Sequence, residues 1–375
     1  MKTLHINTES TWRGGEQQVL SLIKGLETTG HTAHLICQPE SGIHHRALQE
    51  GITPFPMRMR GEIDPAATMK ILQTIRREKY DIIHSHTPHA QALVMWASCL
   101  LARKPLRVFT RRVEFSIFRH SFFGMNRFKY TKGVDHIIAI SQGVRKRLIK
   151  DGIPPDKISV VHSGVNVDQY RGLSDDSVLR EFSVPAAAPI LGSIGYLEEN
   201  KGQRYLIQAM EQVAKEYPES RLFILGSGRL ESELQSMVKD HNLEGNIIFT
   251  GRRDDVGAFL NSFDVLAVSS VEEGLNSTIL DALALEIPVV ATDAGGIPEI
   301  IVHGENGRLV PRADHEALAS GILWMLRHPE QAKAMAKKGC RHVREEFSDA
   351  AMVAKNCLVY QKLIAAKEGG RTSRE

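Results

Sequence analysis

The chain has 375 residues, of which 42% are hydrophobic and 24% charged, with a formal net charge of +3. This is the composition of a globular protein, and the length favours two domains over one. The four cysteines are Cys37, Cys99, Cys340 and Cys357. They lie far apart and form no CxxC pair, which fits reduced thiols and argues against a zinc site or a disulfide framework.

The first residues, MKTLHINTES, lack the apolar core of a signal peptide. The longest apolar stretch, residues 92–102, is too short to span a bilayer, which needs about 20 residues. We therefore expect a cytoplasmic protein.

Short β-rich runs alternate with amphipathic helical patterns along both halves. The runs are TLHIN, AHLIC, TPFPM, DIIHSH, LRVFT, HIIAIS and ISVVH in the first half, and PILGSIG, RLFILG, NIIFTG, DVLAVSS and PVVAT in the second. Such alternation predicts parallel sheets covered by helices on both faces. The fold class is therefore α/β, with two Rossmann-like domains whose ligands bind at the carboxyl ends of the strands. The polar and Pro/Ala-rich stretch 171–189 is interpreted as the interdomain link.

The loop after the first strand holds Gly14 and Gly15 at the start of a predicted helix. Backbone amides can approach an anion closely there. A plain flexible turn before a helix is the alternative. The pattern is not GxGxxG, so it does not indicate a dehydrogenase.

The fourth strand ends in HSHTPHA. His84 and His86 share one face of a strand, and His89 starts the next helix. A metal site is conceivable, but no carboxylate or cysteine clusters nearby, and we expect no metal. A hydrogen bond from one imidazole to a polar ligand, or a simple strand end, fits better.

Basic residues are concentrated in the first half. Residues 1–170 carry a net charge of +10, and residues 171–375 carry −7. The segment 103–132 alone holds nine basic and seven aromatic residues against one acid. Basic and aromatic side chains together favour an anionic bilayer surface, so we expect this segment to dock on a membrane or an anionic glycolipid. The residues expected to make that contact are Arg111, Arg112, Arg119, Arg127 and Lys129.

Two other interpretations of this segment remain. Its phenylalanines could be core residues beneath a solvated basic face. Basic and aromatic residues also suit single-stranded nucleic acid, but no nucleic-acid module is visible and we expect no such partner.

In the second half, Lys201 stands beside Gly202 at a helix start, where it suits a diphosphate or is simply a solvated lysine. Arg252 and Arg253 are either a second phosphate clamp or a solvated pair.

The stretch VEEGLNSTILD, residues 271–281, follows the strand DVLAVSS. Asn276 and Ser277 are candidate helix N-caps whose neighbouring amides would face a phosphate. Asp281, about one turn into that helix, suits the two hydroxyls of a ribose. Glu273 lies in the loop itself. Farther on, Glu299 either contacts a ligand or favours a helix N-terminus.

Taken in order, these segments resemble the retaining glycosyltransferases of family 4, which have the GT-B fold. The matching segments are RGGEQQ (13–18), HSH (84–86), AISQGVRKRL (139–148), VVHSGVNVDQY (160–170), GYLEENKG (195–202), FTGRRDDV (249–256) and EEGLNSTILDALALEIPVVATDAGGIPEII (272–301). The resemblance implies an acceptor-binding domain over 1–170, a nucleotide-sugar donor domain over 171–350, and a helix over 351–375 that returns to the first domain and ends in a frayed tail. The two sheets would face each other across a cleft.

The resemblance also implies roles for single residues. Lys201 would bind the donor diphosphate, and Gly15 would let the backbone approach it. Glu273 would stabilise charge near the anomeric carbon, Asp281 would hold the ribose, and His86 would face the sugar or the acceptor. No cofactor or metal would be needed, because basic residues and helix dipoles do that work.

Three positions depart from the family pattern. Tyr196 stands where an arginine is expected, Asp281 replaces a glutamate, and Glu286 replaces a glycine. Arg252 or Arg253 would compensate for the first change.

The sequence thus predicts a retaining glycosyltransferase, peripheral on the cytoplasmic membrane face, with a glycolipid or lipopolysaccharide-type acceptor. Two rivals are a nucleotide-sugar epimerase on the same fold, which would turn over donor without acceptor, and a non-catalytic protein that only binds nucleotide-sugar.

Overall fold

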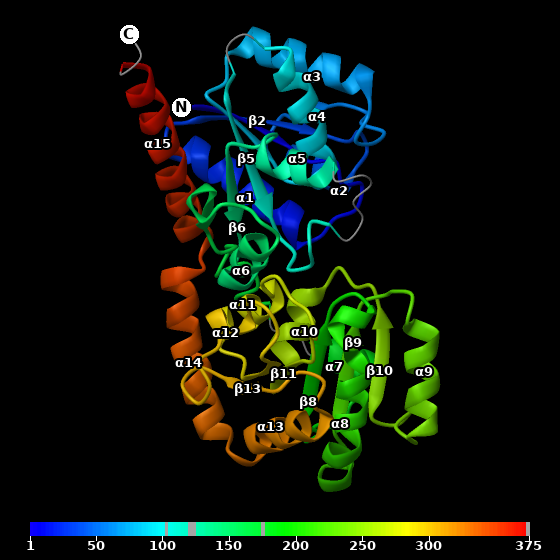
Figure 1. The fold of residues 1–375 in the computed structure, drawn as a ribbon. Coiled ribbons are helices and arrows are strands. Elements are labelled where there is room, and N and C mark those ends of the chain that lie inside the picture. Colours follow the sequence, from blue (N-terminus) through cyan, green and yellow to red (C-terminus); the bar gives the residue numbers. More distant parts are fainter. Residues whose placement is uncertain (102–103, 119–124, 174–176, 373–375) are drawn as a thin grey trace. The chain divides into compact units, whose positions relative to one another are not determined.

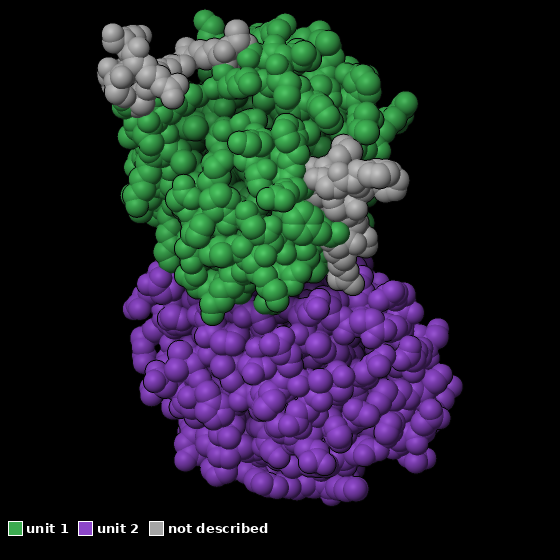
Figure 2. Space-filling view, viewed as in Figure 1, with its two compact units in different colours: residues 1–164, 349–375 green, residues 165–348 purple. Residues whose placement is uncertain are grey.

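The computed structural model describes residues 1–101, 104–118, 125–173 and 177–372. The chain divides into two compact units (Figure 2). Unit 1 comprises Met1–Gly164 and Asp349–Glu375, and unit 2 comprises Val165–Ser348. Arg119 lies outside the described residues.

Unit 1 is built on a seven-stranded sheet in which every neighbouring pair is parallel (Figure 1). Its order is β3-β2-β1-β4-β5-β6-β7. The strands are β1 (Lys2–Ile6), β2 (Thr32–Cys37), β3 (Phe55–Pro56), β4 (Ile82–Ser85), β5 (Leu106–Arg111), β6 (His136–Ala139) and β7 (Ile158–Val160). The central strands are buried on both faces, which explains their nearly continuous apolar sequences.

Helices connect these strands. They are α1 (Gly14–Thr28), α2 (Gly42–Gln49), α3 (Pro65–Glu78), α4 (Pro88–Cys99), α5 (Met125–Thr131), α6 (Gln142–Lys150) and the 3-10 turn η1 (Pro155–Lys157). Ser41, Asp64, Thr87 and Ser141 begin four of them, and each side chain accepts a hydrogen bond from a first-turn amide.

The C-terminal helix α15 (Asp349–Thr372) belongs to unit 1 and runs alongside α1 (Figure 1). The two helices pack so closely at Gly25 that a Cβ there would lie 2.3 Å from Val353 Cγ2. The helix continues to Thr372, past the point where the sequence predicted fraying.

Unit 2 is built on a six-stranded parallel sheet of order β10-β9-β8-β11-β12-β13. The strands are β8 (Ile190–Ile194), β9 (Arg221–Leu225), β10 (Ile247–Gly251), β11 (Val265–Val268), β12 (Val289–Thr292) and β13 (Arg308–Val310). The helices are α7 (Ser177–Glu181), the 3-10 turn η2 (Glu199–Lys201), α8 (Gln203–Glu216), α9 (Glu231–Asp240), α10 (Val256–Ser262), α11 (Ser277–Ala284), α12 (Ile297–Ile300), α13 (His315–Arg327) and α14 (Pro329–Glu346).

The stretch 171–189 is not an interdomain link. Its described residues belong to unit 2, and the division falls between Gly164 and Val165, six residues before the expected boundary at 170. Val178 of α7 is buried, and the ring of Phe182 packs against Phe223 and Phe259. Apolar contacts therefore fix this polar-looking stretch onto the unit 2 core.

Each sheet reverses its strand order at one place. In unit 1 the reversal lies between β1 and β4, and in unit 2 it lies between β8 and β11. Loops that leave the carboxyl ends of such strand pairs diverge to opposite sides, which opens a crevice where ligands bind. These two positions direct attention to the residues after β8 and β11, and after β1 and β4.

None of the helices within the described residues is long and apolar enough to cross a membrane.

Candidate functional site

In unit 2, the loops after β8 and β11 bring Lys201 and Glu273 together. Lys201 ends η2, which follows β8, and Glu273 lies in the loop that joins β11 to α11. Lys201 Nζ lies 2.6 Å from Glu273 Oε2. The side chains are 23% and 11% exposed, so the pair is partly shielded from water. The two residues predicted to act on the sugar-diphosphate bond are therefore direct partners.

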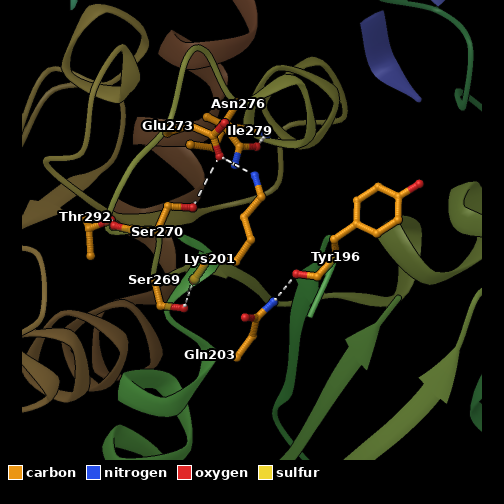
Figure 3. A network of polar contacts seen from close by, with 9 residues as sticks. All are labelled: Tyr196, Lys201, Gln203, Ser269, Ser270, Glu273, Asn276, Ile279 and Thr292. Carbon is orange, nitrogen blue, oxygen red and sulfur yellow. Dashed lines mark hydrogen bonds and ion pairs between the residues drawn. The ribbon is translucent and has the colours of Figure 1, made fainter. Parts of the chain in front are cut away.

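Glu273 Oε2 accepts hydrogen bonds from two further donors (Figure 3). Asn276 Nδ2 lies 3.1 Å away and Ser270 Oγ lies 3.3 Å away. Three donors on one carboxylate oxygen hold the side chain in a single orientation.

The backbone around this pair is fixed as well. Ser269 Oγ donates to the carbonyl of Lys201 at 3.0 Å, and Thr292 Oγ1 donates to the carbonyl of Ser270 at 2.6 Å. Gly202 adopts φ 61°, and a Cβ there would lie 2.3 Å from the carbonyl oxygen of Ser269. Only glycine tolerates both conditions, which explains the Lys-Gly pair.

Asn276 also begins α11, as predicted, because its Oδ1 accepts from the Ile279 amide at 3.1 Å. Its amide group thus caps the helix with one atom and holds Glu273 with the other. Ser277 is the first residue of α11, and Asp281 lies one turn farther, half-buried. The amino-terminal end of α11, with its positive partial charge, lies next to the Lys201–Glu273 pair.

The other donor-site candidates differ in their surroundings. Glu299 is half-buried in the short helix α12. Arg253 is bound by Glu181 and Asp255 and stacks 5.1 Å from the Phe259 ring centroid. It is therefore a structural residue of unit 2 and not a phosphate clamp.

Arg252 is exposed, and Tyr196 is 38% exposed. The Tyr196 carbonyl accepts from Gln203 Nε2 at 2.9 Å. Arg252 thus remains the candidate to replace the charge that Tyr196 lacks.

In unit 1, three buried histidines cluster at the β1–β4 reversal. His5 pairs with His84 in the sheet register, and His86 follows β4. The rings of His84 and His86 lie 4.1 Å apart, which confirms the predicted shared face. The sequence did not reveal His5, because only the pairing of β1 with β4 brings it here.

Every ring nitrogen of the cluster faces a protein partner. His84 bonds to Tyr360 Oη and Thr110 Oγ1, each at 2.6 Å. His5 Nδ1 lies 2.9 Å from His86 Nε2, and His5 Nε2 lies 3.1 Å from Thr3 Oγ1. His86 Nδ1 lies 3.5 Å from Arg112 Nη2.

These contacts determine which ring nitrogens donate and which accept in the hydrogen bonds that link Thr3, His5 and His86. Thr3 Oγ1 donates to the Thr32 carbonyl, so it accepts from His5 Nε2–H. Burial lowers the pKa of His5 to about 3 and that of His86 well below its ordinary value, so both rings are neutral. His5 Nδ1 therefore accepts from His86 Nε2–H, and His86 Nδ1 presents a lone pair to Arg112.

One ring nitrogen from each of the three histidines, His5, His84 and His86, lies within 4.8 Å of the other two, close enough for a metal ion. Hydrogen bonds to protein groups already account for the ring nitrogens, so the residues do not fit an open metal site. Both nitrogens of His86 also face protein groups, so contact with a sugar or an acceptor stays a prediction.

The predicted membrane-contact residues do not form a basic surface. Arg111 is buried and donates to the carbonyls of Val113 and Phe115. Lys129 is buried and paired with Glu62 at 2.7 Å. The basic segment therefore supplies internal ion pairs and hydrogen bonds, and the prediction was wrong for these two residues.

Arg112 also faces inward, against Gly15 and His86. Arg127 and Phe128 are exposed. Of the predicted set, Arg127 alone is seen on the surface within the residues that the structure describes.

Comparisons with known proteins cover nearly the same range as the motifs. The family described as "Glycosyl transferases group 1" matches residues 177–342, and "Glycosyltransferase Family 4" matches residues 12–169. The chain is 27% identical to the lipopolysaccharide core biosynthesis glycosyltransferase LpsE of Rhizobium meliloti, over 80% of each chain. It is 23% identical to the N-acetyl-alpha-D-glucosaminyl L-malate synthase of Bacillus anthracis, over 82% of this chain and 81% of the relative. Among solved structures, Anabaena Alr3699/HepE in complex with UDP aligns with a TM-score of 0.84 and 22% identity, over 96% of this chain and 100% of that one.

Proposed function

The chain belongs to the glycosyltransferases of the group 1 and family 4 type, with the predicted GT-B fold, and we propose that it is a retaining, metal-independent member. Its place is in polysaccharide or glycoconjugate biosynthesis, as for the similar proteins. In this proposal it moves a sugar from a nucleotide-sugar to a hydroxyl of a membrane-associated glycolipid or lipopolysaccharide-type acceptor.

The observation that carries the proposal is the Lys201–Glu273 pair. When the bond between the anomeric carbon and the diphosphate oxygen breaks, the carbon gains positive charge and the oxygen gains negative charge. The positive charge of Lys201 and the negative charge of Glu273 lie 2.6 Å apart. They are opposite in sign to the charges that develop on the oxygen and the carbon, and their separation is comparable. Fixed charges that match the charge developing in the transition state lower the barrier without reorganisation.

In the proposed step, the bonds that form and break, and the proton that moves, all belong to the donor and the acceptor. The acceptor oxygen forms a bond to the anomeric carbon on the face that the diphosphate leaves, so the configuration is retained. The acceptor's hydroxyl proton passes to the departing diphosphate oxygen. Lys201 and the amino-terminal end of α11 stabilise that oxygen, so this step requires no metal ion.

Nucleotide binding is assigned to the same corner of unit 2. Asp281 would accept hydrogen bonds from the ribose hydroxyls, and Arg252 would bind the diphosphate. A uridine nucleotide is the first donor to test, because a neighbour of the same fold was solved with UDP-glucose.

The lipid-linked acceptor rests on the similar proteins, which include the lipopolysaccharide core enzyme LpsE and the capsular polysaccharide enzyme CapM of Staphylococcus aureus. A peripheral position on the cytoplasmic membrane face follows from such an acceptor. The proposed membrane position rests on the acceptor alone, because Arg111 and Arg112 face inward and do not form a docking surface.

A thermal-shift panel of UDP-, GDP- and ADP-sugars identifies the donor, since ligand at 100 times its Kd stabilises the fold by about 2.7 kcal/mol. Transfer is then measured with the selected donor and purified core lipopolysaccharide in EDTA. The anomeric proton coupling of the product is read by NMR. An inverted product refutes retention, and loss of activity in EDTA refutes metal independence. Donor turnover without acceptor indicates the epimerase, and binding without turnover indicates a non-catalytic protein.

A further inference from the structure

A hollow of about 390 Å³ opens in unit 1 at the amino ends of β4 and β5. Its walls come from the end of α3 with the start of β4, from Leu101 after α4 with residues 104–106 at the start of β5, and from the last turns of α15. Pockets that bind small molecules have volumes of about 300–1,000 Å³. The strands separate this hollow from the histidines at their carboxyl ends, so it is not part of the site already described.

The floor of the hollow is apolar and consists of buried and half-buried side chains: Ile75, Tyr80, Leu101, Pro105, Leu106 and Ile364. Tyr80 Oη lies 2.7 Å from His34 Nδ1, so the hydroxyl already has a hydrogen-bond partner. The floor therefore offers mainly carbon surface, and the hydrophobic effect favours a hydrocarbon group there.

The mouth of the hollow is basic. The charged residues that line it are four cations and two acids, which leaves a net charge of +2: Arg76, Lys79, Lys104, Lys367, Asp81 and Glu368. One of the acids is already engaged, because Asp81 Oδ2 accepts from the Lys2 backbone amide at 2.8 Å. A cleft lined by charge of one sign attracts ligands of the opposite sign, so this mouth favours an anion.

Two of the four cations hold the walls together. Arg76 Nη2 donates to the Leu100 carbonyl at 3.0 Å, and Lys367 Nζ donates to the Lys104 carbonyl. The ammonium groups of Lys79 and Lys104 differ, because they make no hydrogen bond or ion pair with any residue that the structure describes. One such surface lysine needs no explanation. Two at the mouth of an apolar hollow fit a ligand that carries an anionic head and an apolar tail.

Apolar surface also continues outside the hollow. Leu100 is 54% exposed and Trp96 is 39% exposed. They are four residues apart at the end of α4 and therefore share one side of the helix. The Leu100 carbonyl is the one that Arg76 binds, so this apolar strip begins at the mouth. A hydrocarbon chain longer than the hollow could continue along it.

We propose that this hollow binds one anionic amphiphile, an alkyl chain that ends in a phosphate or a carboxylate. The chain lies on the apolar floor, and Lys79 and Lys104 bind the head group. A single molecule fits better than a bilayer surface, because the floor is recessed behind the charged mouth. The proposal does not depend on the proposed function.

The test is isothermal titration of the full chain with dodecyl phosphate and with dodecanoate, each below its critical micelle concentration. At least one should bind saturably, with one molecule per chain, and the tighter of the two identifies the head group. Inorganic phosphate has no tail and dodecyl maltoside has a neutral head, so each should bind at least tenfold more weakly.

The double variant Lys79→Gly, Lys104→Gln should bind the amphiphile about tenfold more weakly, because partly solvated ion pairs contribute a few-fold each. Lys79 already has φ 54°, so glycine adds no backbone strain there. The matched control is Lys70→Gln, Lys362→Gln. It removes the same charge from exposed positions of α3 and α15 that do not line the hollow, and it should leave the affinity unchanged.

Ile364→Trp tests the floor, because the larger ring should fill the hollow and abolish binding. Ala365→Trp adds a ring at the next position, which is exposed and does not line the hollow, and it should bind normally. Unfolding temperatures without ligand show that each variant is folded.

Three results would overturn the proposal. The first is no saturable binding of either amphiphile, and the second is binding of dodecyl maltoside as tight as theirs. The third is an affinity that the lysine pair and Ile364→Trp leave unchanged, or that the two controls lower equally. Phosphatidylglycerol vesicles bound through Lys79 and Lys104 without binding of the single amphiphile would make this face a bilayer contact and would also refute the site. Transfer is not measured, so failure here is separate from failure of the proposed function.

Discussion

Replacing Glu273 by glutamine should tighten the binding of UDP while it slows transfer. Lys201 Nζ lies 2.6 Å from Glu273 Oε2, so a diphosphate that binds Lys201 must share the ammonium with a carboxylate. Glutamine keeps an oxygen that can accept from Asn276 and Ser270 but removes the negative charge. The change therefore separates the repulsion of the diphosphate from the loss of catalysis.

The size of the effect follows from the geometry. A phosphate oxygen hydrogen-bonded to Nζ would lie about 5 Å from the carboxylate. Two unit charges at that distance repel by about 3 kcal/mol at an effective dielectric constant of about 20. The pair keeps 11% and 23% of its side-chain surface exposed, so water screens part of this repulsion. Half of it, about 1.5 kcal/mol, corresponds to roughly tenfold tighter binding.

Transfer should fall by about 10²–10³-fold in the same variant, because a neutral amide does not stabilise positive charge at the anomeric carbon. Isothermal titration with UDP measures the affinity, and release of UDP from the donor in the presence of acceptor measures the transfer.

Glu272→Gln is the control, since Glu272 is exposed and adjacent, and the change removes the same charge. The reasoning is refuted by unchanged or weaker UDP affinity in Glu273→Gln, or by equal tightening in Glu272→Gln.

Three further predictions concern nucleotide recognition and stability. Asp281→Asn should weaken UDP binding by about tenfold and abolish the preference for UDP over 2′-deoxy-UDP; an unchanged Kd removes the ribose role. Glu286 adopts φ 61°, so Glu286→Gly should stabilise unit 2 by about 0.5–1 kcal/mol in urea unfolding, whereas Glu286→Ala should not. Burial lowers the pKa values of His5, His84 and His86, so their unfolded forms bind protons below pH 6.5 while the folded forms stay neutral. Stability should therefore be complete well above pH 6.5 and fall by about 1 kcal/mol for each histidine between pH 6.5 and 5.5, approaching about 1.4 kcal/mol per pH unit below that; His86→Gln should remove about a third of that loss, and a flat profile would contradict the assignment.

Most of the fold could be predicted because buried parallel strands have sequences that differ sharply from the helices between them. The exception is β13, the three residues Arg308–Val310, which is too short to show a pattern. The stretch 171–189 was misread for a different reason. Its composition suggests a linker, but Val178 and Phe182 are fixed by residues that lie far away in the sequence.

The donor corner could be predicted in part, because Lys201 and Glu273 each follow a strand and α11 begins at the expected Asn276. Their direct contact could not, since it joins loops 72 residues apart. Ser270 was missed because nothing local marks its hydroxyl as a partner of Glu273.

The basic segment 103–132 shows most clearly what composition alone cannot predict. Arg111 and Arg112 are neighbours of equal charge, but successive side chains at a strand end point to opposite faces. Arg111 donates to carbonyls of the following loop, and Arg112 faces the start of α1. Lys129 meets Glu62, 67 residues earlier. Composition records the charges of such residues but not the partners that remove them from the surface.

The way in which Lys201 is held suits the diphosphate assigned to it. Lys201 has a flexible stem and a point charge, and it is paired with Glu273. It can therefore turn from the carboxylate to a diphosphate whose charge grows during the reaction.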